Sequence, residues 1–121
     1  MIDEAWAHEF AREWVAAWNA HDLERILSHY TDDFEMSSPL IVERMQVPNG
    51  TLKGKDQIRP YWRQGLAAVP PIEFELLELF TGVDSIVILY RSLHRKRVCE
   101  VLTFNAQRQA VRGSAVYGGA A

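Results

Sequence analysis

RVCEVLTFN, residues 97–105, predicts a β-strand, because valine, leucine, threonine and phenylalanine all favour strands. Two further β-rich runs flank it, SIVILYRSLH at 85–94 and QAVRGSAVYG at 109–118. Only short turns separate the three runs, so we expect them to pair as an antiparallel meander. The carboxylate of Glu100 stands inside this apolar strand, and its orientation decides whether the sheet carries a functional site.

The first half of the chain has the periodicity of helices. Aromatic residues every four positions predict a first amphipathic helix, and two later runs with apolar residues three and four apart predict a second, shorter helix and a third that begins at Asp56. The three stripes are Trp6, Phe10, Trp14 and Trp18; Leu23, Ile26, Leu27 and Tyr30; and Ile58, Tyr61, Trp62 and Leu66. Helices followed by an antiparallel sheet indicate an α+β fold.

Two shorter segments complete the expected sheet. DFEMSSPLIV, residues 33–42, alternates Phe34 and Met36 with polar residues, which predicts a strand that ends near Ser38 or continues as an edge. Residues 72–79 also alternate, but the phase slips at Leu77. This slip predicts a β-bulge.

The lengths assumed for the two loops of the meander predict which residues share a face of the sheet. A two- or four-residue loop after His94 places Arg91 opposite Glu100, and a four-residue loop at 106–109 places Ala115 opposite Glu100 and Gly113 opposite Leu102. The small side chains of Gly113 and Ala115 would leave space beside the carboxylate. The inner face is then expected to hold Leu89, Arg91, Glu100, Leu102, Phe104, Gly113, Ala115 and Tyr117.

The opposite face of the meander is too apolar to lie in water. It is expected to hold Tyr90, Cys99, Val101, Thr103, Ser114 and Val116. We expect a second copy of the chain to cover this outer face, which predicts a homodimer.

Composition narrows the class of protein. The 121 residues suit a single domain, 1–121, and 48% hydrophobic with 24% charged residues is ordinary for a globular chain. A net charge of −3 gives no electrostatic footprint for nucleic acid. The N-terminal segment lacks the pattern of a signal peptide, and no apolar run approaches the length of a membrane span, so we expect a cytoplasmic protein without a membrane partner.

Two phrases carry a family resemblance over nearly the whole chain. EWVAAWNAHDLERILSHYTDDFEMSSP, residues 13–39, followed by GTLKGKDQIRPYW, residues 50–62, resembles the nuclear transport factor 2-like superfamily, in its SnoaL-like and ketosteroid isomerase-like branch. The resemblance implies a cone-shaped, curved, mostly antiparallel sheet wrapped by three N-terminal helices around a pocket. It also implies a homodimer.

The resemblance also assigns positions. It places Trp14 where ketosteroid isomerases have a tyrosine, Ser38 where they have the proton-shuttling aspartate, and Glu100 where they have a buried acidic hydrogen-bond donor. Pocket aromatics fall at Trp62 and Tyr117. A serine hydroxyl without an activating partner cannot replace the base, so a ketosteroid isomerase is excluded.

Two interpretations of Glu100 remain open. It acts as a catalytic acid or base whose pKa is raised by an apolar environment, or it forms a buried ion pair with Arg91. The expected ligand-binding residues are Trp14, Trp18, Tyr30, Ser38, Trp62, Arg91 and Tyr117. No metal is expected, because the histidines lack a ligand spacing, and no cofactor is expected.

These features predict a small-molecule-binding protein with an apolar pocket. Its ligand would be lipophilic, and its reaction would be that of a cofactor-independent isomerase, cyclase, dehydratase or hydrolase. The alternative is a non-catalytic binding or dimerisation module with a vestigial pocket. A cavity below about 100 Å³ would contradict the enzyme hypothesis, and residues 40–50 are expected to form either a longer strand or a lid over the pocket.

Overall fold

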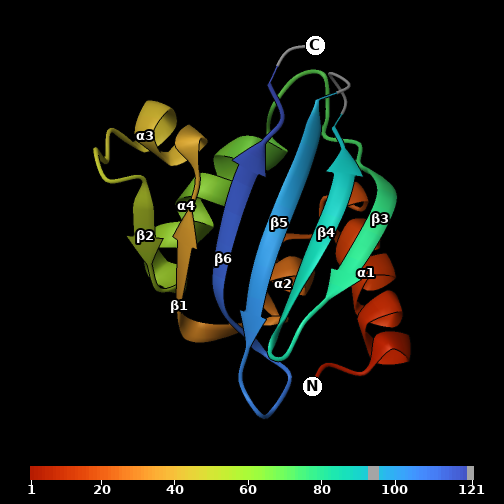
Figure 1. Cartoon of the computed structure of the whole chain (residues 1–121). Coiled ribbons are helices and arrows are strands. Elements are labelled where there is room, and N and C mark those ends of the chain that lie inside the picture. Colours follow the sequence, from red (N-terminus) through yellow and green to blue (C-terminus); the bar gives the residue numbers. More distant parts are fainter. Residues whose placement is uncertain (93–95, 120–121) are drawn as a thin grey trace.

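The computed structural model describes residues 1–92 and 96–119. Within these residues, helices pack against one face of a curved sheet that does not close into a barrel, and the other face has no helix on it (Figure 1). The helices are α1 (Glu4–Asn19), α2 (Leu23–Leu27), α3 (Pro39–Met45) and α4 (Lys55–Leu66). The strands are β1 (Tyr30–Ser37), β2 (Thr51–Lys53), β3 (Glu75–Thr81), β4 (Ser85–Arg91), β5 (Arg97–Phe104) and β6 (Ala110–Tyr117).

The sheet confirms the predicted α+β class. Its six strands lie in the order β2-β1-β6-β5-β4-β3. The pair β1–β6 is parallel, and every other neighbouring pair is antiparallel. The last four strands form the predicted meander, and a register shift between Leu76 and Glu78 confirms the predicted bulge. None of the helices in the described ranges has the length and hydropathy to span a bilayer.

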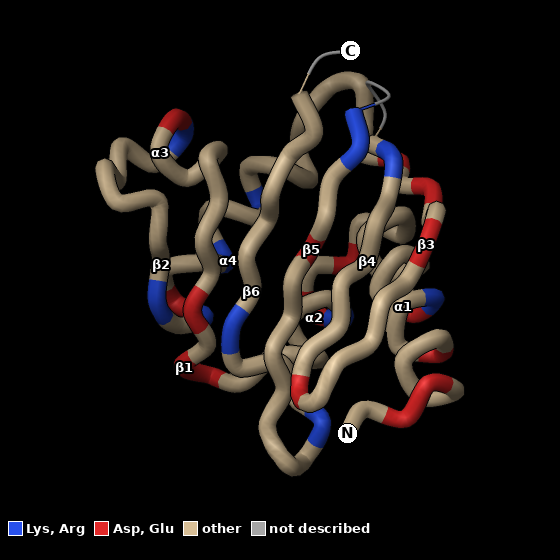
Figure 2. Tube along the Cα trace, viewed as in Figure 1, with Lys and Arg blue, Asp and Glu red and all other residues tan. Residues whose placement is uncertain are grey.

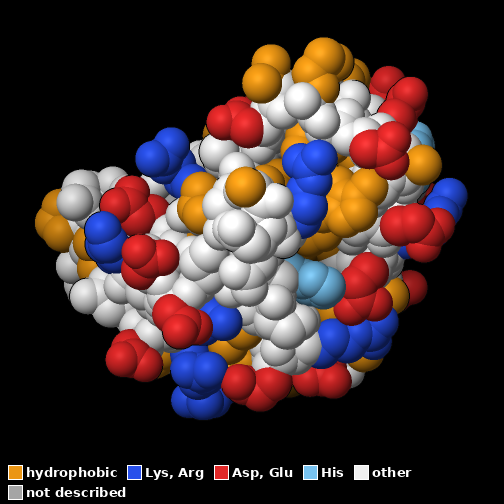
Figure 3. All heavy atoms as spheres, turned by 90° about the horizontal axis from the view of Figure 1, so that it is seen from below, with side chains coloured by type: hydrophobic (Ala, Val, Ile, Leu, Met, Phe, Trp, Pro, Cys, Tyr) orange, Lys and Arg blue, Asp and Glu red, His pale blue; other side chains and the backbone are white. Residues whose placement is uncertain are grey.

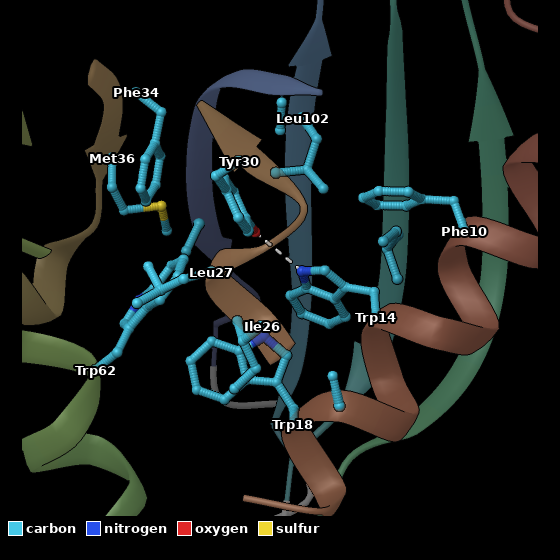
Figure 4. Close-up of a cluster of buried hydrophobic side chains, with 14 of the residues drawn as sticks. Phe10, Trp14, Trp18, Ile26, Leu27, Tyr30, Phe34, Met36, Trp62 and Leu102 are labelled. Carbon is cyan, nitrogen blue, oxygen red and sulfur yellow. Dashed lines mark hydrogen bonds between the residues drawn. The ribbon is translucent and has the colours of Figure 1, made fainter. Parts of the chain in front are cut away.

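The first helix forms where the aromatic stripe predicts it. The Asp3 side chain caps α1 by accepting a hydrogen bond from the Trp6 backbone N–H at 2.9 Å. Phe10, Trp14 and Trp18 are buried against the sheet. The aromatic stripe is therefore the contact between the helix and the core, as Figure 4 shows.

The second helix is shorter than predicted. It ends at Leu27, and Tyr30 is the first residue of β1, where it pairs with Ala110 of β6. The expectation that Tyr30 belongs to the helix is therefore wrong. Its ring packs against Phe34 with centroids 4.4 Å apart, and this burial in the core outweighs the helical spacing of Tyr30.

Residues 39–45 form a helix where the sequence suggested a longer strand or a lid. Ser38 adopts an extended conformation and caps α3, because its Oγ accepts a hydrogen bond from the Leu40 N–H at 3.1 Å. Pro39 occupies the first turn, where its missing N–H costs nothing. Ile41 is fully buried and anchors the helix to the core. The helix stops at Gln46, which has a left-handed conformation with φ 55°.

The predicted register between β4 and β5 is wrong. Ile88, not Arg91, lies opposite Glu100, and Arg91 lies opposite Arg97. Because the Ser92 N–H donates to the Lys96 carbonyl at 2.8 Å, the connection holds three residues instead of two or four. Because the loop differs from both assumed lengths by one residue, the residues of β4 expected on the inner face lie on the outer face and the reverse. Tyr90 therefore points inward, whereas Leu89 and Arg91 do not. His94, the residue at which that loop was expected, lies outside the described residues.

The predicted register between β5 and β6 is confirmed for Val98 to Thr103, but the assumed four-residue loop is wrong: the Asn105 N–H donates to the Gln109 carbonyl around three residues, and a register shift between Thr103 and Phe104 offsets the difference. Glu100 faces Ala115, Leu102 faces Gly113 and Val98 faces Tyr117. Gly113, however, does not open space beside the acid. A Cβ atom at this position would lie 3.1 Å from both the Leu102 Cδ2 and the Met36 Sδ, so neighbouring side chains already fill the room that the glycine leaves.

Gly113→Val should therefore destabilise the fold. The added methyl groups would collide with the buried Leu102 and Met36, which should lower the free energy of unfolding by about 2 kcal/mol in a urea titration followed by tryptophan fluorescence. Ser114→Val, one residue later on the other face of β6, is the matched control and should change it by less than about 0.5 kcal/mol. Equal effects of the two substitutions would contradict close packing at Gly113.

Candidate functional site

A cavity of about 510 Å³ lies between the sheet and the helices. It is located at the upper end of the molecule in Figure 1, where β4 and β6 end, away from the N-terminus. Figure 3 shows the opposite end of the molecule, where hydrophobic areas lie among acidic and basic side chains. Apolar and aromatic lining residues include Trp14, Trp18, Met36, Leu40, Tyr61, Trp62, Ile72, Phe74, Tyr90, Val98, Ala115 and Tyr117.

Glu100 is an acidic residue in the wall of this cavity. Its side chain points to the inner face of β5, between Ile88 and Ala115 on the neighbouring strands, and the residue is only 6% exposed. Burial raises the pKa of Glu100 from 4.5 to about 7, because the ionised carboxylate loses hydration. Near neutral pH the group can therefore either accept or donate a proton.

Tyr90 is the hydrogen-bond partner of the acid. Its hydroxyl donates to the Glu100 Oε1 at 3.3 Å, and this bond opposes the effect of burial on the pKa of Glu100. Burial raises the pKa of Tyr90 itself well above its usual value, so the phenol stays a donor. The sequence prediction missed Tyr90 because it placed this residue on the outer face. The alternation of Ile86, Ile88 and Tyr90 was visible, but it does not indicate which face points inward.

Arg91 does not neutralise Glu100. Its guanidinium donates to the Glu75 carboxylate at 3.0 Å and lies at the edge of the meander. The hypothesis of a buried Arg91–Glu100 ion pair is therefore wrong. Arg91, expected among the ligand-binding residues, is also not in the cavity lining.

The three predicted tryptophans come together at the cavity. Trp14, Trp18 and Trp62 all border it, and the ring centroids of Trp18 and Trp62 lie 5.2 Å apart. The Trp14 Nε1–H donates to the Tyr30 hydroxyl at 3.0 Å (Figure 4). Tyr30 does not itself line the cavity. Its hydrogen bond orients the Trp14 ring from a position outside the cavity lining. Burial raises the pKa of the Tyr30 phenol far above the usual range.

Ser38 and Tyr117 lie near each other at the end of the sheet. Ser38 is 4% exposed and borders a second, shallower groove of about 360 Å³, which Tyr117 also lines. Burial raises the pKa of Tyr117 to about 12, and the nearby Tyr61 phenol and the Glu100 charge act in the same direction. Burial likewise raises the pKa of Tyr61. Both phenols are thus neutral hydrogen-bond donors at physiological pH.

Charged residues also border the cavity away from the acid. Glu43 and Arg44 lie on α3, and Lys96 precedes β5. All three are exposed. Glu100, by contrast, is deeply buried in the wall of the cavity. We call the solvated part of the lining, with Glu43, Arg44 and Lys96, the mouth of the cavity. Among the described residues, no cluster of histidine, cysteine, aspartate and glutamate could hold a metal ion.

The comparisons with known proteins agree with this fold. The SnoaL-like domain family matches residues 11–118. A solved SnoaL-like protein of unknown function from Burkholderia thailandensis is 47% identical, with 98% of each chain covered and a TM-score of 0.94. The chain therefore belongs to the SnoaL-like family. Among curated proteins, none matched the sequence.

More distant structures share the fold alone. An NTF2-like protein of unknown function from Cytophaga hutchinsonii is 8% identical, with 93% of this chain and 89% of that chain covered and a TM-score of 0.71. SalBIII, described as an epoxide hydrolase/cyclase-like enzyme in pyran ring formation in the polyether salinomycin, is 18% identical, with 98% and 95% covered and a TM-score of 0.74. Together with the match to the SnoaL-like family and the 47% identical structure, this shared fold confirms the resemblance to the nuclear transport factor 2-like superfamily.

The raised pKa of Glu100 predicts an unusual pH dependence of stability. The folded protein binds the proton of Glu100 more tightly than the unfolded chain, so this contribution is complete below pH 4.5 and is lost as the pH rises through about 7. Glu100→Gln cannot ionise. From pH 5 to pH 8 the wild type should lose about 2 to 3 kcal/mol of unfolding free energy relative to this variant.

Urea titrations at pH 5, 6, 7 and 8 measure this difference. Glu78→Gln, on the exposed strand β3, is the control and should follow the wild type across the series. Parallel curves for Glu100→Gln and the wild type would show that the buried carboxyl has an ordinary pKa.

Proposed function

We propose that the protein binds a small lipophilic molecule in the cavity and that Glu100 transfers a proton to or from it. The observation that supports this function is a single carboxyl with a pKa of about 7 in the wall of a largely apolar cavity. A volume of about 510 Å³ lies within the range of small-molecule sites and far above the size at which the enzyme hypothesis would fail.

The proposed chemistry needs only a proton donor or acceptor and hydrogen-bond donors. An isomerase, cyclase, dehydratase or hydrolase of a lipophilic substrate would meet this description. The ionised Glu100 would remove a proton from the substrate, with the Tyr90 hydroxyl stabilising the carboxylate at 3.3 Å, and the protonated form would return it. Tyr61 and Tyr117 would donate hydrogen bonds to a substrate oxygen.

Two further observations bear on the reaction class. Ser38 uses its hydroxyl to cap α3, so it is not a replacement for the aspartate base of ketosteroid isomerases. The distant relative SalBIII is described as epoxide hydrolase/cyclase-like, and both of those reactions belong to the proposed range. That similarity extends to the fold only, so the reaction is proposed from the site.

Native mass spectrometry of the freshly purified protein tests ligand binding. We expect a reproducible extra mass on the chain. Ala115→Phe, which fills the cavity beside Glu100, should abolish this mass, whereas Val116→Phe on the other face of β6 should retain it. Identical spectra for the two variants would place the ligand elsewhere.

The ligand identified in this way supplies the test of catalysis. Glu100→Gln should reduce turnover of that compound, or of its precursor, by about 10²- to 10⁴-fold while ligand binding remains. The rate of the wild type should change with an apparent pKa of about 7. Full activity of Glu100→Gln would exclude Glu100 from the reaction, whereas a wild type without turnover would leave a non-catalytic binding module as the function.

We also propose that two copies of the chain associate through the outer face of the sheet. No helix covers this face in Figure 1, and Val87, Leu89 and Val101 on it are partly exposed. Val116 is 49% exposed. Figure 2 shows the basic residues of β4 and β5 at the upper ends of these strands. Val87 and Val101 pair further along the strands, and the exposed Arg112 of β6 lies beside Thr103 on the same face.

Sedimentation equilibrium tests the dimer. The wild type should have twice the mass of the 13.9 kDa chain, and Val101→Lys should weaken association at least tenfold because it places a charge in the middle of the face. Val83→Lys changes an exposed valine between β3 and β4 and should leave the mass unchanged. A monomeric wild type would refute this arrangement.

A further inference from the structure

The charges around the cavity are unevenly distributed. Glu100 lies in the enclosed wall, whereas Arg44 and Lys96 lie in the exposed part of the lining, on two segments that border the mouth. Glu43 is the acidic residue that accompanies them. Among the described residues of the lining, these two cations and one carboxylate give the mouth one net positive charge, although the chain as a whole carries a net charge of −3.

The Arg44 side chain reaches from α3 to the neighbouring helix α4. A Cβ atom at Gly65 of α4 would lie 3.7 Å from the Arg44 Nη1, so the guanidinium reaches from α3 to the facing surface of α4. Its positive charge slightly opposes the rise that burial causes in the pKa of Tyr61 and of Tyr117, in agreement with its place in the same cavity lining. These phenols lie on α4 and β6.

The Arg44 guanidinium has no carboxylate partner within the described part of the chain. Arg25, Arg59 and Arg91, by contrast, each form an ion pair with a glutamate at 2.6 to 3.0 Å. Even the adjacent Glu43 does not pair with Arg44. The planar guanidinium, with donors that match a carboxylate, is thus free to bind a ligand group.

We propose, building on the function proposed above, that the ligand is a lipophilic carboxylate. Its apolar body would occupy the aromatic interior, and its carboxylate would remain at the mouth between Arg44 and Lys96. The opposite orientation would bring the ligand's negative charge to the buried Glu100, where two carboxylates would repel each other. A doubly charged phosphate matches the single net positive charge of the mouth less well.

The test uses two pairs of probes that differ only in the charged end. These are decanoate with 1-decanol, and 1-naphthaleneacetate with 1-naphthaleneethanol, titrated at pH 8 and low salt. Binding of both pairs is measured by isothermal titration calorimetry. For the decanoate pair it is also followed by tryptophan fluorescence, to which Trp14, Trp18 and Trp62 at the cavity contribute. We expect the acid of at least one pair to bind five- to tenfold more tightly than its alcohol, and added salt should reduce this preference.

Variants assign the preference to the mouth. Arg44→Gln combined with Lys96→Gln should remove the preference for the acid and leave the affinity for the alcohol unchanged. Arg63→Gln is the matched control, because it removes an exposed positive charge from α4 that does not line the cavity. It should retain the preference, and circular dichroism should show that all variants are folded.

The outcomes separate this inference from the proposed function. If acid and alcohol bind equally, or if the double variant keeps the preference, the carboxylate inference is wrong and the lipophilic site remains. If neither member of either pair binds or changes the tryptophan fluorescence, both proposals fail. A preference that Arg63→Gln removes as well would show a general effect of net charge and would also overturn the inference.

Discussion

The register of β5 against its two neighbours is the constraint on which the site depends. It brings Ile88 and Ala115 to either side of Glu100 and turns the carboxyl towards the helices. A shift by one residue would turn the same carboxyl to the outer face. In the observed register the neighbouring polar group is the Tyr90 hydroxyl, a neutral donor, and burial raises the pKa of the acid to about 7. Strand pairing thus determines both how much the ionised Glu100 lowers the free energy of unfolding and whether its carboxyl can exchange a proton near neutral pH.

The remainder of the cavity is built from two parts that differ in burial. In the aromatic wall, Trp14 is fully buried and donates a hydrogen bond to Tyr30. The mouth is made in part by α3, a seven-residue helix with a serine cap and a single fully buried anchor, Ile41. A rigid apolar interior with a solvated, charged rim suits an amphipathic ligand better than a purely apolar one.

Membership of the family leaves the chemistry of the cavity open. The resemblance to ketosteroid isomerases implies a catalytic aspartate at the position of Ser38, and here the serine hydroxyl caps a helix. Glu100 lies in the wall of the cavity, where the apolar environment gives it a near-neutral pKa. Membership of the SnoaL-like family therefore establishes the fold, whereas any reaction depends on which polar groups face the cavity.

The sequence by itself determined the α+β class, the aromatic stripe of α1, the bulge in β3 and the pairing of Glu100 with Ala115. The first three features follow from periodicity within one segment. The pairing of Glu100 with Ala115 rests on a short hairpin connection, and the register shift at Phe104 offsets the one-residue error in its assumed length. Only the tertiary structure decided that Tyr90 faces inward, that Arg91 pairs with Glu75, and that residues 39–45 form a helix at the mouth. The physical reason is that the alternation of side chains along a strand does not indicate which face is buried. One residue more or less in a connecting loop therefore changes which side chains lie beside the acid.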